Sequence, residues 1–491
     1  MNRDGYALSG NTPTLRPETD DCYARTKTAM KSRSPTLILF NYEFDAIGFK
    51  RACLAKGEPL PEDAGFDLFS FPSNANLVWF DMERFVNRLA KKAKSKGWTA
   101  VVSSQEQFGA LTAALLAEKM GWPGTPVEAV LACQHKVYAR EVLQRVYPQA
   151  NPEFAVLEAE YGADVPHGVS YPRFVKPVKA AFSVLARVVH SRHELTAHTR
   201  FGVWELWVIR RLVEPFERIF QKRMRLQQNQ QSAHRLMLEE PISAPQFNLD
   251  GYVWKGKASL FGVVDAVMYP GTQAFMRWDY PSRLHTCIQQ RAMDVAQAFL
   301  TAVGFNHGLF NMEFFYNEAQ DRLTVIEFNP RMASQFSDLY LRVDGIDLHA
   351  CALAMAHGRH PDSERRIAAT AGAASSLVYR SFSPEQQCMM PNAYQTAQFH
   401  KAYPDGLLFP FPKDKSSIGR DFKWLGCYRY GIAHLGGKDP ADLRHRAEAA
   451  SRILGWPAPY LELSPMPLEG TKDSKATHIN PSIAFLGTSR P

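Results

Sequence analysis

The sequence predicts a multidomain fold of mixed α/β and α+β class. The chain has 491 residues, which is too many for one ordinary hydrophobic core. Near the N-terminus, short apolar strands alternate with a helical segment, as in a small α/β domain. Further along, apolar strands follow one another across short polar turns, as in antiparallel hairpins. These observations predict a small α/β domain followed by larger α+β parts.

The N-terminal domain is predicted from two strands and one helix. Thr36–Phe40 (TLILF) and Trp98–Ser103 (WTAVVS) are runs of apolar, often branched residues that favour buried strands. Gln105–Met120 has apolar residues at helical spacing. Gly121 and Pro123 then supply a helix stop signal.

The middle of the chain is predicted to hold further helices and strands. The expected elements are a helix or helix pair at Val127–Tyr147, a strand at Tyr171–Pro177 with a hairpin partner at Phe182–Val189, helix over most of Glu194–Lys222, strands at Arg235–Glu240, Gln246–Trp254 and Ala258–Met268, a turn and then a helix at Tyr280–Thr301, and a helix at Ile346–Ala356.

Six segments are expected along the chain. The tails are polar or rich in Pro, Ser and Thr, and are expected to be disordered. The expected boundaries are a disordered tail at 1–34, the N-terminal α/β domain at 35–130, a linker helix and small subdomain at 131–240, a larger subdomain at 241–365, a C-terminal subdomain at 366–462 and a disordered tail at 463–491.

The most informative motif is a predicted hairpin late in the chain. Its strands are Leu309–Tyr316 (LFNMEFFY) and Leu323–Arg331 (LTVIEFNPR), joined by a polar turn. If the hairpin is centred near Gln320, Glu313 lies opposite Glu327. Cross-strand partners have Cβ atoms about 5 Å apart. The motif therefore predicts two carboxylates side by side on one face of a sheet.

Asn329 extends this pair into a metal-binding pattern. It follows Glu327 by two residues and so points to the same face of the strand. Like charges held this close are unfavourable unless a positive group lies between them. Carboxylate and amide oxygens suit Mg²⁺ beside a phosphate, with Mn²⁺ as a second choice. The alternative is a solvent-exposed sheet face with two unrelated acids.

Composition argues against several classes of function. The net charge is +8, but the basic clusters Lys91–Lys96 and Lys222–Arg225 lack the interleaved aromatic residues of a nucleic-acid platform. No apolar run approaches the roughly 18 residues of a membrane helix. The 7 cysteines are widely spaced and form no CxxC motif, which favours reduced thiols and a cytoplasmic location. We therefore expect neither nucleic acid nor membrane as a partner.

Charged residues ahead of the hairpin form an ordered set. Lys136 lies in CQHKVYAR, Lys176 lies in FVKP, and Glu239 and Glu240 end a predicted strand. Two lysines at separate places suit the phosphates of a nucleotide as point charges. Arg331, directly after the metal face, suits a carboxylate or a phosphate through its bidentate geometry. Each lysine alone is better explained as a surface residue, and the two acids alone could end an exposed strand. For Arg331 the alternative is an ion pair at the strand end, and the order of the whole set carries the argument.

This order resembles the ATP-grasp superfamily, particularly its carboxylate–amine ligases, which include L-amino acid ligases. The resemblance covers about residues 36–360, and Ile326–Arg331 (IEFNPR) is its most specific part. The resemblance implies that residues 131–240 contain the lid subdomain and that residues 241–365 form the metal-binding subdomain. The roles it implies are phosphate binding by Lys136, Lys176 and Ser183, ribose binding by Glu239 or Glu240 beside an adenine-binding hinge, a nucleotide or metal contact from Gln246, Mg²⁺ binding by Glu313, Glu327 and Asn329, and catalytic roles for Arg331 and Lys176.

Three departures from the family pattern stand out. Val178–Ser183 occupies the place of a glycine-rich phosphate loop but contains no glycine. Gln246 stands where relatives usually have glutamate. After Arg331, the segment Met332–Ser334 replaces a glycine-containing turn, so the acceptor pocket is expected to differ. None of these changes removes the metal face.

The resemblance implies an ATP-dependent ligase that forms an amide through an acyl phosphate, releasing ADP and phosphate. Its expected partners are a small carboxylate, with an amino acid as first choice, and an amine, and many relatives form homodimers. Asp279 or Arg283 is a candidate contact for the acceptor. The alternative is a catalytically degenerate ATP-grasp protein that binds nucleotide in a regulatory or scaffold role. A nucleic-acid-associated protein is a third reading.

Overall fold

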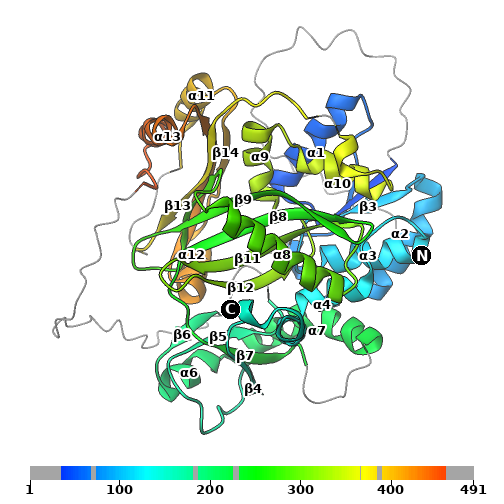
Figure 1. The fold of residues 1–491 in the computed structure, drawn as a ribbon, viewed down its shortest axis with the longest axis vertical. Coiled ribbons are helices and arrows are strands. Elements are labelled where there is room, and N and C mark those ends of the chain that lie inside the picture. The colour runs from blue at the N-terminus through cyan, green and yellow to red at the C-terminus, as the bar shows by residue number, and fades with distance from the viewer. Residues whose placement is uncertain are drawn as a thin grey trace, which may run out of the picture.

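The computed structural model describes residues 35–67, 73–180, 186–224, 232–364, 366–383 and 390–460 (Figure 1). The expected disordered tails at 1–34 and 463–491 and the candidate residue Ser183 lie outside these ranges. Within the ranges, no helix is both long enough and apolar enough to cross a membrane.

The N-terminal domain is a three-stranded parallel sheet with helices around it. β1 (Thr36–Leu39) lies between β2 (Glu62–Ala64) and β3 (Ala100–Val102), and it is buried throughout. The helices are α1 (Glu43–Lys56), α2 (Met82–Lys96) and α3 (Gly109–Met120). The predicted strands and helix are present.

The helix α3 begins later than predicted because a side chain caps it. The Gln105 side-chain oxygen accepts hydrogen bonds from the backbone N–H groups of Phe108 and Gly109, each at 2.8 Å. This places Gln105 and Glu106 in the connection after β3 and outside the helix. Glu106 is thereby free to point into the site described below.

Two helices and a small sheet form the next part of the chain. α4 (Val127–Gln134) and α5 (Lys136–Val146) are separated at His135, whose extended backbone breaks the helix and whose side chain accepts from the N–H of Tyr138. The small sheet, which we call the lid, has four antiparallel strands in the order β4-β7-β5-β6 and lies at the lower end of the view in Figure 1. Its elements are β4 (Phe154–Glu160), β5 (Arg173–Pro177), β6 (Arg187–Val189), α6 (Arg192–Thr199), α7 (Val203–Met224) and β7 (Arg235–Glu239).

A large antiparallel sheet forms the centre of the molecule. It has eight strands in the order β12-β11-β8-β9-β10-β13-β15-β14. The strands are β8 (Gln246–Trp254), β9 (Lys257–Met268), β10 (Phe275–Tyr280), β11 (Gly308–Asn317), β12 (Arg322–Asn329), β13 (Ala373–Ser381), β14 (Leu407–Pro410) and β15 (Tyr428–Gly437). The helices of this part are α8 (Thr286–Ala302), α9 (Ser337–Asp344), α10 (Leu348–Ala356), α11 (Ala393–Ala402), α12 (Lys415–Leu425) and α13 (Pro440–Leu454).

One face of this sheet is apolar and packs against α8. On β11 the residues Phe310, Met312 and Phe314 alternate with polar ones, and all three are buried against helix α8 and its neighbours. On β12, Phe328 stacks on Phe299 of α8 with ring centroids 3.8 Å apart. The alternation leaves the polar residues of the same strands on the opposite face.

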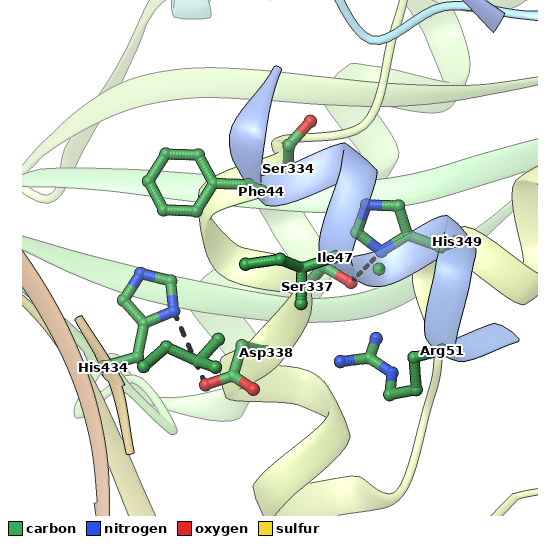
Figure 2. Close-up of a pocket in the computed structure, with 10 residues that line it drawn as sticks. Phe44, Ile47, Arg51, Ser334, Ser337, Asp338, His349 and His434 are labelled. Carbon is green, nitrogen blue, oxygen red and sulfur yellow. Dashed lines mark hydrogen bonds and ion pairs between the residues drawn. The ribbon is translucent and has the colours of Figure 1, made fainter. Parts of the chain in front are cut away.

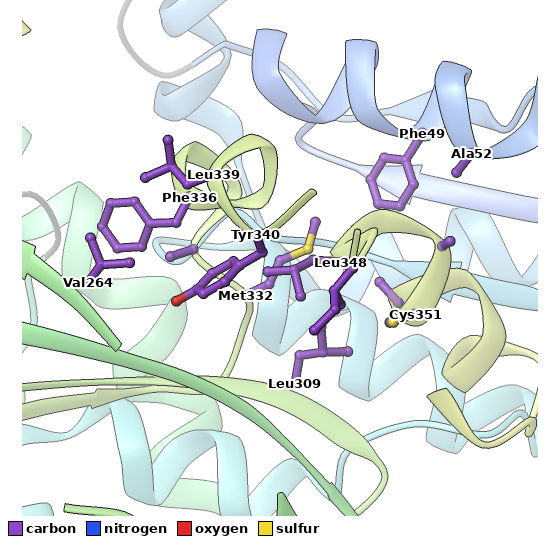
Figure 3. Close-up of a cluster of buried hydrophobic side chains, with 14 of the residues drawn as sticks. Phe49, Ala52, Val264, Leu309, Met332, Phe336, Leu339, Tyr340, Leu348 and Cys351 are labelled. Atoms are coloured by element: carbon purple, nitrogen blue, oxygen red, sulfur yellow. The ribbon is translucent and has the colours of Figure 1, made fainter. Parts of the chain in front are cut away.

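A second apolar cluster joins the opposite side of the sheet to the N-terminal domain. Figure 3 shows Tyr340, Leu348 and Met332 packed together, with Phe49 of α1 close by. The sheet comes close to this cluster only because Gly262 has no side chain, since a Cβ there would lie 2.7 Å from Tyr340 and 2.6 Å from Tyr280. The cluster fixes the connection after Arg331 against the sheet.

The structure differs from the sequence prediction in two places. β10 is a full strand that ends at Tyr280, where the sequence predicts the start of a turn. Its charged residues face a partner within the fold, because Arg277 and the hydroxyl of Ser375 both bind Asp279. In addition, β13, β15 and β14 continue the large sheet, so residues 366–460 share it with the predicted metal-binding subdomain.

Candidate active site

A grid of polar side chains from β8, β11 and β12 occupies part of the sheet face opposite α8. In the strand register, Glu313 pairs with Glu327 on one side and with Asn248 on the other. The next row pairs Asn311 with Asn329 and Asp250. Since directly opposed residues share a face, two rows of three polar groups lie side by side. The two amide residues Asn248 and Asn311 and the carboxyl group of Asp250 were not found from the sequence.

A β-bulge in β12 creates the Glu313–Glu327 pair. From the turn to Phe314 and Val325 the pairing is regular, and then the register shifts by one residue at Ile326. Val325 therefore faces α8, although Glu327, two residues later, faces the polar grid. The main-chain oxygen of Ile326 leaves the regular ladder and accepts from Arg140 at 2.7 Å and from Lys176 at 3.4 Å.

The electrostatics of the pair fit a divalent cation. Burial and the neighbouring Glu327 carboxylate raise the pKa of Glu313 to about 8. Burial opposes ionisation of Glu327 as well, but Lys136 and its other cationic neighbours outweigh it and lower the pKa of Glu327 to about 2. One of the two carboxylates is thus left without sufficient positive charge, which is the deficit that a metal ion would fill. Among the described residues, no group of three or more His, Cys, Asp or Glu side chains could hold a metal ion. The third ligand predicted from the sequence is the amide Asn329.

The other two predicted members of this face have partners within the grid. The side-chain N–H of Gln246 donates to Glu313 at 3.0 Å. The side-chain N–H of Asn329 donates to the side-chain oxygen of Asn311 at 3.2 Å, which orients the Asn329 amide. A glutamate at position 246 would add a third carboxylate beside Glu313 and Glu327, whereas Gln246 donates a hydrogen bond to Glu313.

Lys136 is the first residue of α5 and lies against the metal face. Its ammonium binds Glu327 at 2.9 Å and donates to the main-chain oxygen of Ala180 at 3.1 Å. Its backbone N–H donates to the oxygen of Val178, so the start of α5 is attached to the segment after β5. Burial disfavours the charge, but Glu327 and the other acids nearby raise the pKa of Lys136. Lys136 thus neutralises the predicted metal ligand from the lid side.

Lys176 belongs to a buried ion-pair cluster between the lid strands and α5. Its ammonium binds Glu239 of β7 at 2.8 Å, and Arg140 of α5 binds the same carboxylate at 2.6 Å. Burial, with the nearby Arg140 and Lys136, lowers the pKa of Lys176 to about 8, although Glu239 opposes the shift. Glu239 is thus occupied by two cations, and the neighbouring Glu240 pairs with Arg322 of β12.

Arg331 pairs with a residue that the sequence did not single out. Its guanidinium donates to the Glu106 carboxylate at 2.8 Å. Glu106 is buried and Arg331 is partly buried. Glu106 comes from the connection after β3, so the N-terminal domain completes the site. The available signal was the position of Glu106 after the C-terminal end of a parallel strand, where α/β sheets place their ligands.

The connection that carries Glu106 is held by a chain of hydrogen bonds. The hydroxyl of Ser104 donates to Asp45 of α1, and His349 of α10 binds the other oxygen of Asp45 at 3.0 Å. Ser337 binds the second nitrogen of His349, at 2.9 Å (Figure 2). The cavity in Figure 2, about 10 Å³ in volume, has room for about one water molecule. It is too small for a substrate.

The fold is similar to that of ATP-grasp proteins, and a family model matches part of the chain. Residues 169–338 match the family model described as the ATP-grasp domain, which confirms the resemblance drawn from the sequence. A curated relative, the uncharacterised protein y4rH of Sinorhizobium fredii (strain NBRC 101917 / NGR234), is 24% identical over 307 residues. That alignment covers 61% of this chain and 57% of the relative, so the chain spans less than two-thirds of the relative's length.

Solved ATP-grasp structures share the fold over most of the chain. The L-amino acid ligase of Bacillus licheniformis superposes with a TM-score of 0.61 at 17% identity, covering 86% of this chain and 98% of the ligase. The N5-carboxyaminoimidazole ribonucleotide synthetase of Thermus thermophilus gives a TM-score of 0.54 at 15% identity, covering 88% and 100% of the two chains. The biotin carboxylase domain of the Hydrogenobacter thermophilus 2-oxoglutarate carboxylase was solved with MgADP and bicarbonate. It gives a TM-score of 0.54 at 13% identity, covering 86% of this chain and 90% of that domain. At these identities the likeness concerns the fold.

Proposed function

We propose that this protein is an ATP-dependent ligase that joins a carboxylate to an amine through an acyl phosphate. The observation that carries the proposal is the line of charged groups across the site. It runs from Lys176 at the lid, through Lys136 and the Glu313–Glu327 pair, to Arg331 at the N-terminal domain. Phosphate-binding cations, a metal face and a carboxylate-binding guanidinium thus follow in the order that phosphoryl transfer to a carboxylate requires.

ATP is proposed to lie between the lid and the large sheet, with its adenine at β7. Lys136 and Lys176 would bind its phosphates, and Ser183, outside the described residues, would add a hydroxyl. Glu239 and Glu240 are both held in ion pairs, so ribose binding by either requires that carboxylate to accept a further hydrogen bond. Glu313, Glu327 and Asn329 would hold Mg²⁺ or Mn²⁺, which neutralises phosphate charge when bound. Gln246 would orient Glu313.

The reaction proceeds in two balanced steps. A carboxylate oxygen of the first substrate attacks the γ-phosphorus, a new O–P bond forms, and the bond to the β-phosphate oxygen breaks to leave ADP. The amine nitrogen of the second substrate then attacks the acyl carbon, loses a proton, and displaces phosphate. Arg331 holds the carboxylate and then the acyl phosphate, and the lysines stabilise charge on the transferring group.

An α-amino acid is the proposed carboxylate substrate. Arg331 and Glu106 lie 2.8 Å apart and present a cation and an anion to the same space. Such a pair matches a zwitterion. Its carboxylate would replace Glu106 as the partner of Arg331, and its ammonium would replace Arg331 as the partner of Glu106. The fold shared with an L-amino acid ligase supports the same choice.

The test is release of ADP and phosphate from Mg·ATP over a matrix of amino acids and other small acids against amines. Wild-type protein is expected to release both products only with matching pairs. Glu327→Ala and Arg331→Ala are expected to lose this release. Glu318→Ala, an exposed acid in the turn of the same hairpin, is the matched control and should retain it. ATP turnover that is the same in wild type and Glu327→Ala would overturn the proposal.

A second candidate is a nucleotide-binding regulatory protein on a degenerate ATP-grasp fold. The segment Val178–Ser183 favours this hypothesis. It has no glycine, and a stiffer loop adapts less closely to the phosphates of a nucleotide. This reading predicts tight Mg·ATP binding and no ADP release across the whole matrix.

A further inference from the structure

Lys179 is a buried cation that the roles assigned above do not use. It lies two residues after the end of β5 and is 2% exposed. Its ammonium has no hydrogen-bond partner in the part of the chain that the structure describes. Lys136 and Lys176, by contrast, each bind a carboxylate. A buried ammonium is normally paired, so this arrangement calls for an explanation.

The position of Lys179 places its charge inside the site. On one side the ammonium lies 5.1 Å from the centroid of the Phe216 ring of α7. The charged groups that act on it most strongly are Glu106, Lys136, Glu327 and Arg331. Two of these groups form the Arg331–Glu106 pair and the other two form the Lys136–Glu327 pair at the metal face, so the charge of Lys179 is felt by both parts of the site. For Lys176, in contrast, the charged groups with the largest effect are Glu239 and Arg140.

A purely structural role for Lys179 is the competing explanation. In that role the ammonium would stay at Phe216 and stabilise the fold through a cation–π contact. Burial nevertheless lowers the pKa of Lys179 to about 8, and the nearby Glu106 and Glu327 do not offset this effect. The free protein therefore holds a positive charge that it does not compensate.

We propose that Lys179 is a third phosphate-binding lysine, which binds the γ-phosphoryl group of the nucleotide. The inference rests on the proposed function and adds the residue that takes over from a glycine-rich loop. Main-chain N–H groups of such a loop usually surround a phosphate. In this chain a side-chain ammonium supplies the positive charge from the same segment. The γ-phosphoryl group would lie between Glu327 of the metal face and Arg331, and both of these charged residues act on Lys179.

The first test measures stability without ligand. Lys179→Met keeps the length and apolar contacts of the side chain and removes the charge. If Lys179 waits for an anion, the melting temperature of Lys179→Met should equal or exceed that of wild type, by about 2 °C or more where the unpaired charge is costly. If the cation–π contact is its role, the variant should melt lower. Lys119→Met, at an exposed lysine of α3, is the control.

The second test measures nucleotide binding by calorimetry. Lys179→Met is expected to weaken Mg·ATP binding by about tenfold or more and to change Mg·ADP binding by less than about threefold, which is the selectivity of a γ-phosphate contact. Lys179→Arg should recover part of the ATP affinity, because it restores the cation. Equal effects on ATP and ADP, or no effect on either, would overturn the inference.

Inorganic tripolyphosphate separates this inference from the proposed function. If wild type binds no nucleotide, the proposed function fails. Stabilisation of wild type by tripolyphosphate that is lost in Lys179→Met would still establish Lys179 as an anion-binding residue. Equal stabilisation of both proteins, or of neither, would overturn the inference about Lys179.

Discussion

The buried cluster of Arg140, Glu239 and Lys176 predicts opposite effects for two neutralising substitutions. Glu239→Gln removes the one carboxylate that two cations share, at 2.6 and 2.8 Å. The three side chains are only 4–7% exposed, so solvent screens them little. Removing one partner of a buried pair costs about 3–5 kcal/mol. We expect Glu239→Gln to lie in the upper part of that range, because it leaves two cations uncompensated.

Lys176→Met should not destabilise the protein. Burial holds the pKa of Lys176 at about 8, below its ordinary 10.5, so the fold disfavours its charged form below pH 8. That difference corresponds to a penalty of about 3 kcal/mol, at about 1.4 kcal/mol per tenfold. The substitution removes the penalty and leaves the Arg140–Glu239 pair intact. Wild type should gain stability as the pH rises from 8 to 10.5, where the folded protein releases a proton that the unfolded chain keeps.

Denaturant unfolding at pH 7, followed by circular dichroism, measures both effects. Lys176→Met should unfold at the same or higher denaturant concentration than wild type, and Glu239→Gln at a clearly lower one. Equal destabilisation by the two variants would refute the reasoning, because it would mean that Lys176 stabilises Glu239 more than its own burial costs.

Three further predictions concern the large sheet. Burial raises the pKa of Asp250 to about 7, so the ionisation of Asp250 should lower the stability of the protein as the pH rises from 3.8 to 7. In Asp250→Asn the unfolding midpoint should therefore change less between pH 5 and pH 8 than in wild type. An unchanged difference in that variant would contradict this. Gly262→Ala should lower the melting temperature by an amount equivalent to about 1–3 kcal/mol, because the new Cβ would lie 2.6 Å from Tyr280 and 2.7 Å from Tyr340. A melting temperature equal to that of wild type would show that the two rings move freely. Mg²⁺ with ADP should raise the melting temperature of wild type and of Glu318→Ala but not of Glu327→Ala, whereas equal shifts in all three would place the metal elsewhere.

The hairpin shows both the reach and the limit of prediction from sequence. Its strands, the opposition of Glu313 to Glu327 and the grouping with Lys136 follow from periodicity and motif order, and the structure has them. The predicted centre near Gln320 gives the right pair only because of the bulge at Ile326. The regular register set by the turn would have placed Ile326 opposite Glu313. Bulges depend on packing across a whole sheet, which a local pattern does not record.

The residues missed from the sequence depend on contacts between distant segments. Glu106 meets Arg331 across 225 positions of chain. Lys179 looks like an ordinary surface lysine in sequence, and only its burial beneath α7 makes it informative. The strand β10 was missed because its charged residues, Arg277 and Asp279, pair with each other along the strand. In each case tertiary contacts, which local propensity does not encode, decide the outcome.

The most direct test of the proposed ligase follows the oxygen of the carboxylate substrate. A pool of amino acids labelled with ¹⁸O in the carboxyl group is incubated with Mg·ATP, an amine pool and the protein, and the released phosphate is analysed by mass spectrometry. An acyl phosphate requires one labelled oxygen to leave with each phosphate, since the amine displaces the oxygen that attacked the γ-phosphorus. The proposed ligase should give singly labelled phosphate that depends on both pools and on Arg331. Unlabelled phosphate released at the same rate would show ATP hydrolysis and exclude an acyl phosphate.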